Sequence, residues 1–100
     1  MENKLTYKLS IAADKDLNDI FDYTQIQFGK SQAITYLNEI ESIIFLLLNN
    51  PYLGKERNEI RLELRSIKCN SHIIFYRIFQ QHLRIVRVLH TSKDLEQFSD

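Results

Sequence analysis

The chain has 100 residues, of which 44% are hydrophobic and 26% charged, enough apolar material for one modest core. We therefore expect a single domain over residues 1–100. The longest apolar run, residues 43–48, is far shorter than the roughly 20 residues of a membrane-spanning helix, and the N-terminus lacks the pattern of a secretion signal. A lone cysteine, Cys69, excludes an internal disulfide and is typical of a reducing compartment. The composition predicts a cytoplasmic protein without a membrane partner.

The formal net charge of zero hides a separation of charge along the chain. Residues 1–54 carry four basic and seven acidic side chains, a net charge of −3. Residues 55–93 carry nine basic and three acidic side chains, a net charge of +6, and residues 94–100 return −3. Such a distribution predicts a basic face for an acidic partner or nucleic acid, but solvated charges at strand edges produce the same pattern. Both interpretations stay open.

The N-terminal half predicts one strand and two helices. Residues 4–9 alternate apolar and polar side chains, as a half-buried strand does. Ser10 is a good helix N-cap, and apolar residues then recur at helical spacing until Gly29 ends the helix. Ser31 is expected to cap a second, more apolar helix that ends at residues 49–51, "NNP". Because so few residues separate the helices, we expect a helical hairpin.

The C-terminal half predicts strands. After a turn at residues 51–54, we expect a strand near residues 60–64, a less regular stretch, and two strong strands at His72–Phe79 and Leu83–His90. A three-residue hairpin loop would place Phe79 opposite Leu83 and Phe75 opposite Arg87. The order strand, helix, helix and three strands predicts an α+β fold, with the hairpin on one face of a small, twisted, mostly antiparallel sheet.

Both faces of the last two strands are apolar, with basic residues among them. Two helices can cover only one face, so the other is expected to need a partner. With the three-residue loop, one face would carry Ile73, Phe75, Arg77, Ile85, Arg87 and Leu89.

Several segments in this order resemble one family of proteins. The stretches "GKERNEIRLELRS", "HIIFYR" and "IVRVLHTSKD" resemble the RelE/ParE superfamily of bacterial type II toxins, and "YTQIQFG", "QAITYL" and "NPYLGKERNEIR" are most similar to its ParE branch, the plasmid stabilisation proteins. The resemblance implies a toxin that inhibits DNA gyrase by binding, with the A subunit as the expected contact, and that a cognate ParD-like antitoxin neutralises. It implies no cofactor, and no sequence-specific nucleic-acid binding except through the antitoxin complex.

The other large branch of this superfamily cleaves messenger RNA on the ribosome. RelE-type enzymes carry an arginine where this chain has Ile73, and an arginine and a tyrosine near the C-terminus, where it has Ser92 and Phe98. Three polar functions are missing at once, which argues against that chemistry. The alternative is a histidine-based ribonuclease site with His90, Asp94 and Arg65. The competing interpretation, which we favour, is that His90 ends its strand by hydrogen-bonding the next turn.

The resemblance and the charge pattern together select candidate binding residues. The sheet face listed above supplies the antitoxin-binding candidates, Ile73, Phe75, Arg77, Ile85, Arg87 and Leu89. Target-binding candidates are basic residues of the last third and the C-terminal edge, namely Arg57, Arg61, Arg65, His90, Lys93, Asp94 and Phe98. Alternation in "IRLEL" would put Arg61, Glu63 and Arg65 on one side of a strand. In the alternative interpretation, Glu63 only neutralises its neighbours.

Overall fold

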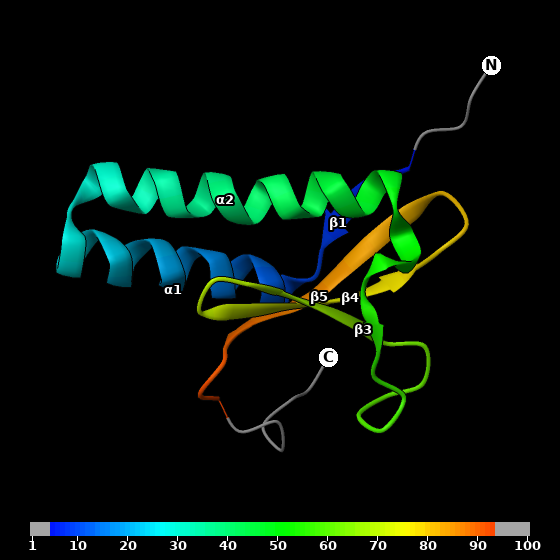
Figure 1. Ribbon diagram of the computed structural model, residues 1–100. Helices are drawn as coiled ribbons and strands as arrows, with labels where there is room; N and C mark the ends of the chain where they lie inside the picture. The colour runs from blue at the N-terminus through cyan, green and yellow to red at the C-terminus, as the bar shows by residue number, and fades with distance from the viewer. Residues whose placement is uncertain (1–4, 94–100) are drawn as a thin grey trace.

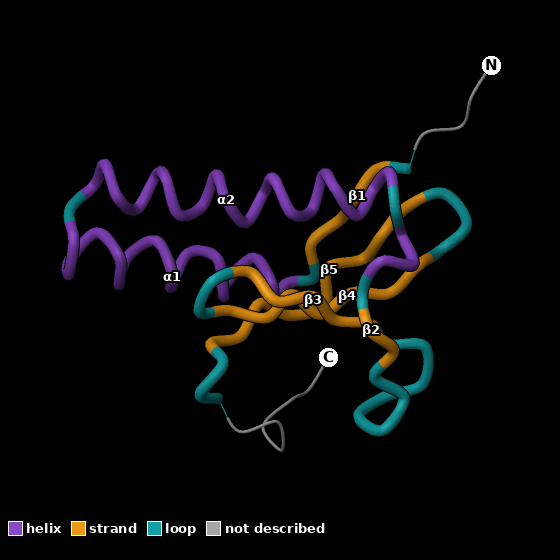
Figure 2. Tube along the Cα trace, viewed as in Figure 1, coloured by secondary structure: helices purple, strands orange, loops and turns teal. Residues whose placement is uncertain are grey.

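Two antiparallel helices pack on one face of a five-stranded sheet in the computed structural model, which describes residues 5–93 (Figure 1). The elements in chain order are β1 (Thr6–Leu9), α1 (Ile11–Phe28), α2 (Lys30–Asn49), the 3₁₀ turn η1 (Pro51–Leu53), β2 (Lys55–Glu56), β3 (Arg65–Cys69), β4 (His72–Ile78) and β5 (His82–His90). The strands lie in the order β1-β5-β4-β3-β2, with β1 parallel to β5 and the other pairs antiparallel. Figure 2 shows the strands gathered on one side of the two helices. The predicted α+β fold with a helical hairpin is confirmed.

The helical hairpin begins and turns at residues that the sequence identifies. The Ser10 hydroxyl accepts the Ala13 N–H at 2.9 Å and donates to the Val86 carbonyl at 2.7 Å, so one side chain caps α1 and ties it to β5. Gly29 adopts φ 94°, in the left-handed region, and donates its N–H to Gln25. Its carbonyl also accepts the Ala33 N–H of α2. The expected Ser31 cap is therefore wrong, because α2 already begins at Lys30 with Gly29 as its N-cap.

The strand expected near residues 60–64 is also wrong. This segment is a turn, and the strand begins at Arg65 in the stretch that the sequence left irregular. A local hydrogen bond stabilises this turn. Glu63 adopts φ 65° and donates its N–H to the Asn58 side-chain oxygen at 2.9 Å. Leu64 then points into the protein and is fully buried. Local hydrogen bonding therefore overrides the alternation in "IRLEL".

A β-bulge between β4 and β5 changes the expected pairing. Ile78 faces Leu83, one residue away from the predicted Phe79–Leu83 pair, while Phe75 does face Arg87. The shift occurs between Phe75 and Tyr76. A bulge adds one residue to one strand, and a shift of one residue moves side chains to the opposite face. Leu83 and Ile85 therefore lie beneath the helices, and the predicted placement of Ile85 beside Phe75 is wrong.

The sheet separates two apolar clusters. The larger lies under the helices and includes Ile40, Ile44, Leu47, Ile74 and Tyr76. The smaller lies on the opposite side, called the open face here, and consists of Leu64, Phe75, Val86 and Leu89, with Ile60 and Ile73 packed against it. Ile60 and Leu64 come from the turn at residues 57–64, so the chain itself covers part of the face expected to need a partner. Within residues 5–93, no helix is long and apolar enough to cross a membrane.

Candidate functional site

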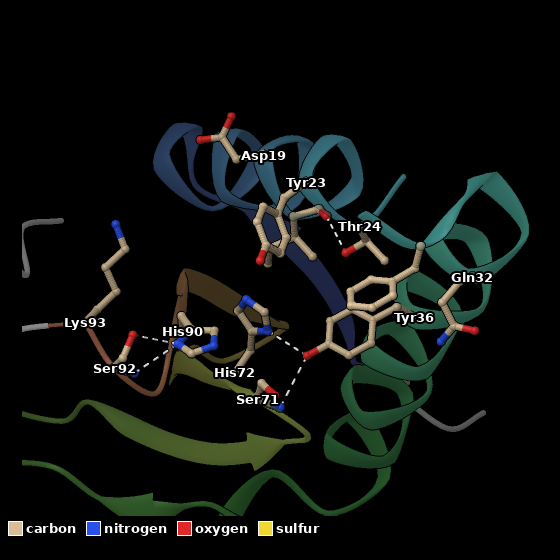
Figure 3. A pocket seen from close by; sticks show the side chains of 12 residues that line it. Asp19, Tyr23, Thr24, Gln32, Tyr36, Ser71, His72, His90, Ser92 and Lys93 are labelled. Carbon is tan, nitrogen blue, oxygen red and sulfur yellow. Dashed lines mark hydrogen bonds between the residues drawn. The ribbon is translucent and has the colours of Figure 1, made fainter. Parts of the chain in front are cut away.

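A cavity of about 960 Å³ lies between the helical hairpin, the start of β4 and the end of β5 (Figure 3). Both helices contribute to its wall, and the start of β4 and the end of β5 form its other side. Its volume is in the range of natural ligand-binding sites. The lining residues are Asp19, Ile20, Tyr23, Thr24, Phe28, Gln32, Tyr36, Ser71, His72, His90, Ser92 and Lys93.

His72 and Tyr36 form the hydrogen-bonded centre of this cavity (Figure 3). The Tyr36 hydroxyl accepts the Ser71 N–H at 3.3 Å and shares a hydrogen bond with His72 Nδ1, 2.6 Å away. Burial, assisted by nearby His90, lowers the pKa of His72 to about 4, and Asp16 acts in the opposite direction. Burial raises the pKa of Tyr36, so its hydroxyl keeps its proton.

His90 faces the same space but has different partners. Its Nδ1 accepts the Ser92 N–H at 3.1 Å and lies 2.8 Å from the Ser92 hydroxyl. This bond confirms the interpretation that His90 ends its strand by binding the following turn. Its ring stands almost perpendicular to that of His72, with centroids 5.2 Å apart. The cavity thus has an imidazole pair on its floor.

The end of β5 beside this cavity is fixed by an ion pair with α1. Arg87 donates from Nε and Nη2 to the two carboxylate oxygens of Asp16, at 2.8 and 2.9 Å. Asp16 also accepts the Val88 N–H at 2.9 Å. A carboxylate that holds both a fork and a backbone amide gives strong, directional hydrogen bonds. The pair therefore sets the position of α1 relative to the strand that carries His90.

The cavity combines polar groups on its inner wall with aromatic side chains at its rim. No group of three or more metal-ligating side chains occurs among the described residues. Cys69 is buried, and that burial raises the pKa of its thiol. Tyr23 and Phe28 are 62% and 69% exposed, so aromatic surface stands open at the rim. Exposed aromatic surface beside buried polar groups is typical of a binding site.

Two of the basic target-binding candidates are engaged with the protein itself. Arg57 donates to Glu59 at 2.7 Å and to the Ser66 hydroxyl at 3.1 Å, and its guanidinium lies over the Phe75 ring. Arg65 donates to the Gly54 and Tyr52 carbonyls at 2.6 and 3.3 Å. Arg61 is half-buried in the turn. The predicted row of Arg61, Glu63 and Arg65 along a strand does not form, because Arg61 and Glu63 precede β3.

The remaining target-binding and catalytic candidates divide by location. His90 and Lys93 line the cavity, whereas Asp94 and Phe98 lie outside the described residues. Arg65 pairs with Tyr76 in the sheet, four positions along β4 from His72, which corresponds to about 13 Å of strand. The histidine-based set of His90 and Arg65 is therefore not brought together at the cavity. The roles of these residues in binding stay predictions.

The antitoxin-binding candidates do not share one surface. Phe75 and Leu89 are buried in the smaller cluster, and Ile85 is buried beneath the helices. Arg87 is held by Asp16. Ile73 and Arg77 remain half-buried on the open face. Of the six, Ile73 and Arg77 thus offer the most accessible surface there.

Sequence reasoning missed the residues that build the cavity around His72. The sequence places Tyr36 within the second predicted helix and His72 at the start of a predicted strand. They lie 36 positions apart in the chain, so only the packing of α2 on β4 brings them together. One local signal existed, because a tyrosine or histidine in an apolar stripe needs a hydrogen-bond partner when it is buried.

Comparison with known proteins gives a consistent answer. The family model described as "ParE toxin of type II toxin-antitoxin system, parDE" matches residues 7–95. Toxin ParE1 of Mycobacterium tuberculosis is 37% identical over 92 residues, covering 91% of this chain and 94% of that protein. Toxin ParE1 of Caulobacter vibrioides is 35% identical over 86 residues, covering 86% and 88%.

Solved structures share the fold at lower sequence identity. A chain of the chromosomal ParDE system of P. aeruginosa superimposes with a TM-score of 0.76 at 18% identity, covering 89% of this chain and 98% of that one. A chain of the RelBE2 toxin–antitoxin complex of Mycobacterium tuberculosis gives a TM-score of 0.58 at 20% identity, covering 87% and 98%. These likenesses support the fold, and the family match with the curated relatives extends over nearly the whole chain. The chain therefore belongs to the ParE family of toxins of type II toxin–antitoxin systems.

Proposed function

We infer that this toxin inhibits DNA gyrase by binding, without catalysing a reaction of its own. The observation that carries the proposal is the match to the ParE toxin family over residues 7–95. The link from that family to gyrase, through its A subunit, comes from the sequence resemblance. Such a toxin would act in the cytoplasm, where gyrase and its DNA are found.

The site geometry favours binding over RelE-like cleavage. Cleavage of RNA needs a base, cations for the phosphate and an acid for the leaving oxygen. Ile73 has no polar group, and the Ser92 hydroxyl and N–H are both turned to His90. His72 has its Nδ1 occupied by Tyr36. The described residues thus lack the arginine pair of a RelE-type centre at the corresponding positions.

A supercoiling assay with purified gyrase tests the proposal. Toxin freed of antitoxin should inhibit supercoiling and increase the amount of cleaved DNA trapped on gyrase. The double variant Arg61→Ala/Lys93→Ala should lose much of this inhibition, since both residues belong to the basic candidate set. The matched control is Lys15→Ala/Lys30→Ala, which removes the same charge from the helices. If the wild-type toxin leaves supercoiling unchanged at concentrations that arrest cells, the gyrase assignment is wrong.

The proposed neutralising partner is a ParD-like antitoxin encoded beside the toxin. The solved relatives above come from a ParDE system and a RelBE2 complex, whose titles name toxin–antitoxin assemblies. The cavity rim offers an amphipathic partner segment the exposed rings of Tyr23 and Phe28. Ile73 and Arg77 add contact surface on the open face. Co-expression with the neighbouring reading frame should yield a complex with a raised melting temperature. A toxin whose melting temperature is indifferent to that neighbour would contradict this part of the proposal.

One observation favours the alternative, a ribonuclease with a histidine-based site. The rings of His72 and His90 lie 5.2 Å apart on the floor of the cavity, and Lys93 is nearby. A neutral histidine can act as a base and a second one as an acid. A translation assay with programmed ribosomes decides the question. We expect no cleavage of messenger RNA, whereas site-specific cleavage that His90→Ala abolishes would make the alternative the better assignment.

A further inference from the structure

Three basic side chains form a row across the open face of the sheet. Lys8 of β1 pairs with Arg84 of β5, and Arg84 pairs with Arg77 of β4. Their strand neighbours Tyr7, Leu83 and Ile78 pack into the cluster beneath the helices. Because side chains alternate along a strand, Lys8, Arg84 and Arg77 point to the opposite side. We call this set the basic row.

The charges of the basic row are poorly balanced within the described part of the chain. Neither Lys8 nor Arg84 has an ion-pair or hydrogen-bond partner among residues 5–93, and both are exposed. Arg77 forms an ion pair with Glu63, with Nη2 and Oε1 3.7 Å apart, and its buried Nε has no hydrogen-bond partner among the described residues. Like charges directly opposite each other destabilise a sheet. An arrangement that costs stability in the free toxin indicates a ligand of opposite charge.

A second row of side chains runs beside the basic row. Thr6 pairs with His82, next to the hairpin at which Phe79 donates its N–H to the His82 carbonyl. The Phe79 and His82 rings are stacked, 10° from parallel with centroids 5.0 Å apart. The Arg77 guanidinium lies 5.2 Å from the Phe79 ring centre. A hydroxyl, an imidazole and an aromatic face thus flank the three cations.

We propose that the basic row binds the phosphodiester backbone of DNA, as an additional contact of the toxin with gyrase-held DNA. Neighbouring strands are about 4.8 Å apart, so the row spans about 10 Å. Three cations can neutralise about three backbone phosphates and release their counterions. The arginine forks suit phosphate oxygens, and the lysine adds a point charge. The contact is independent of base sequence.

The chemistry of the surface favours a nucleic-acid backbone over an acidic peptide. The forked guanidinium groups of Arg77 and Arg84 match phosphate oxygens. The stacked rings of Phe79 and His82 also offer a flat surface to a sugar or an unpaired base.

Fluorescence anisotropy with the full-length toxin and labelled DNA, without gyrase, tests the inference. For three phosphate contacts, the slope of log affinity against log salt concentration should be about −2.7 for duplex and about −2.1 for single-stranded DNA. Between about 50 and 200 mM salt, duplex affinity should fall about 40-fold. Comparison of the two DNA forms identifies the source of the phosphates.

A pair of matched variants isolates the basic row. Lys8→Gln/Arg84→Gln changes two exposed residues whose replacement should not unfold the toxin, and the duplex slope should weaken by about 1.8. Lys15→Gln/Lys30→Gln removes the same charge from the helices and should leave the slope unchanged. Equal losses from the two variants, or no salt-dependent binding by the wild type, would overturn the inference.

Two further measurements separate this inference from its alternatives. The inference rests on the proposed function only for the choice of DNA as the ligand. Gyrase inhibition without DNA binding would therefore show that the basic row does not bind DNA, and would leave the proposed function unchanged. DNA binding with no effect on supercoiling supports the basic row and rejects the gyrase proposal. If the Lys8→Gln/Arg84→Gln variant weakens the antitoxin complex and leaves DNA affinity unchanged, the row serves the antitoxin and the inference fails.

Discussion

Two groups of basic side chains in this toxin differ in what their charges do. Arg57, Arg65 and Arg87 each bind a carboxylate, and their side chains are only 15–18% exposed. Lys8 and Arg84 stand exposed opposite each other on the open face. The first group stabilises the fold, whereas the second is available to a ligand. The net charge of +6 over residues 55–93 therefore overstates the charge that a partner meets.

The difference between the two groups also affects which arginines should be replaced to test target binding. Arginines are frequent at binding hot spots, and the sequence offers Arg57, Arg61 and Arg65 as an evenly spaced set. In the structure, Arg65 fixes two carbonyls of the turn after α2. Loss of toxicity in an Arg65 variant would therefore have two explanations, misfolding of the toxin and a lost contact with the target. Predictions for these residues need a stability measurement beside the activity.

The largest effect is expected for Arg87→Ala. The substitution leaves the Asp16 carboxylate, whose side chain is only 11% exposed, without its cation. Breaking a buried pair by removing one partner costs about 3 kcal/mol. Urea unfolding should show this loss, and the exposed Lys15–Asp19 pair provides the control, because Lys15→Ala should change stability little. An Arg87→Ala protein as stable as the wild type would contradict the distinction between the two groups.

Arg65→Ala should have the next largest effect. It removes the charge-assisted hydrogen bonds to the Gly54 and Tyr52 carbonyls, and the stacking on the Tyr52 ring at 5.0 Å. We expect a cost of about 2 kcal/mol in the free energy of unfolding. Chemical denaturation and the supercoiling assay should be run on the same preparation. A variant that keeps wild-type stability but no longer inhibits gyrase would move Arg65 into the group that contacts the target.

His72 supplies a pH-dependent test of the cavity. Its pKa is lowered to about 4 in the folded protein, against about 6.5 in the unfolded chain. The unfolded state therefore binds more protons between these values, and the stability contributed by neutral His72 is lost as pH falls from about 6.5 to about 4. After allowance for partial solvent exposure, the loss should be about 1–2 kcal/mol. His72→Gln should flatten the pH dependence of urea unfolding in this window, whereas an unchanged slope would show that His72 titrates normally.

The sequence is sufficient to predict the structural role of a residue that acts only on its neighbours in the chain. Ser10 and Gly29 show their roles locally, because a cap needs only the first turn of the helix and a left-handed turn needs only the missing side chain. The alternation in "IRLEL" predicts a strand where the chain forms a turn at residues 57–64. The hydrogen bond from the Glu63 N–H to the Asn58 side-chain oxygen competes there with strand pairing. The bulge could not be predicted either, since alternation carries no signal for one extra residue.

The candidate site depended even more on contacts between distant parts of the chain. Asp16 and Arg87 are 71 positions apart, and Tyr36 and His72 are 36 apart. Lys8 and Arg84 become neighbours only because β1 pairs in parallel with β5. The sequence could predict a basic region, because charge adds along a segment. It could not predict which cations would be balanced, because that depends on the register of the sheet.

The smallest expected effect has the opposite sign. Arg84→Gln removes the central cation of the basic row, so its repulsion with Lys8 and Arg77 is relieved. We expect the free energy of unfolding to rise by about 0.5 kcal/mol at low salt, and the gain to shrink as salt screens these exposed charges. Lys68→Gln is the control, because Lys68 faces Ile73 rather than a cation. Urea unfolding at two salt concentrations should show a gain only for Arg84→Gln. A loss of stability that persists at high salt would instead place Arg84 with Arg87, as a residue that holds the fold together.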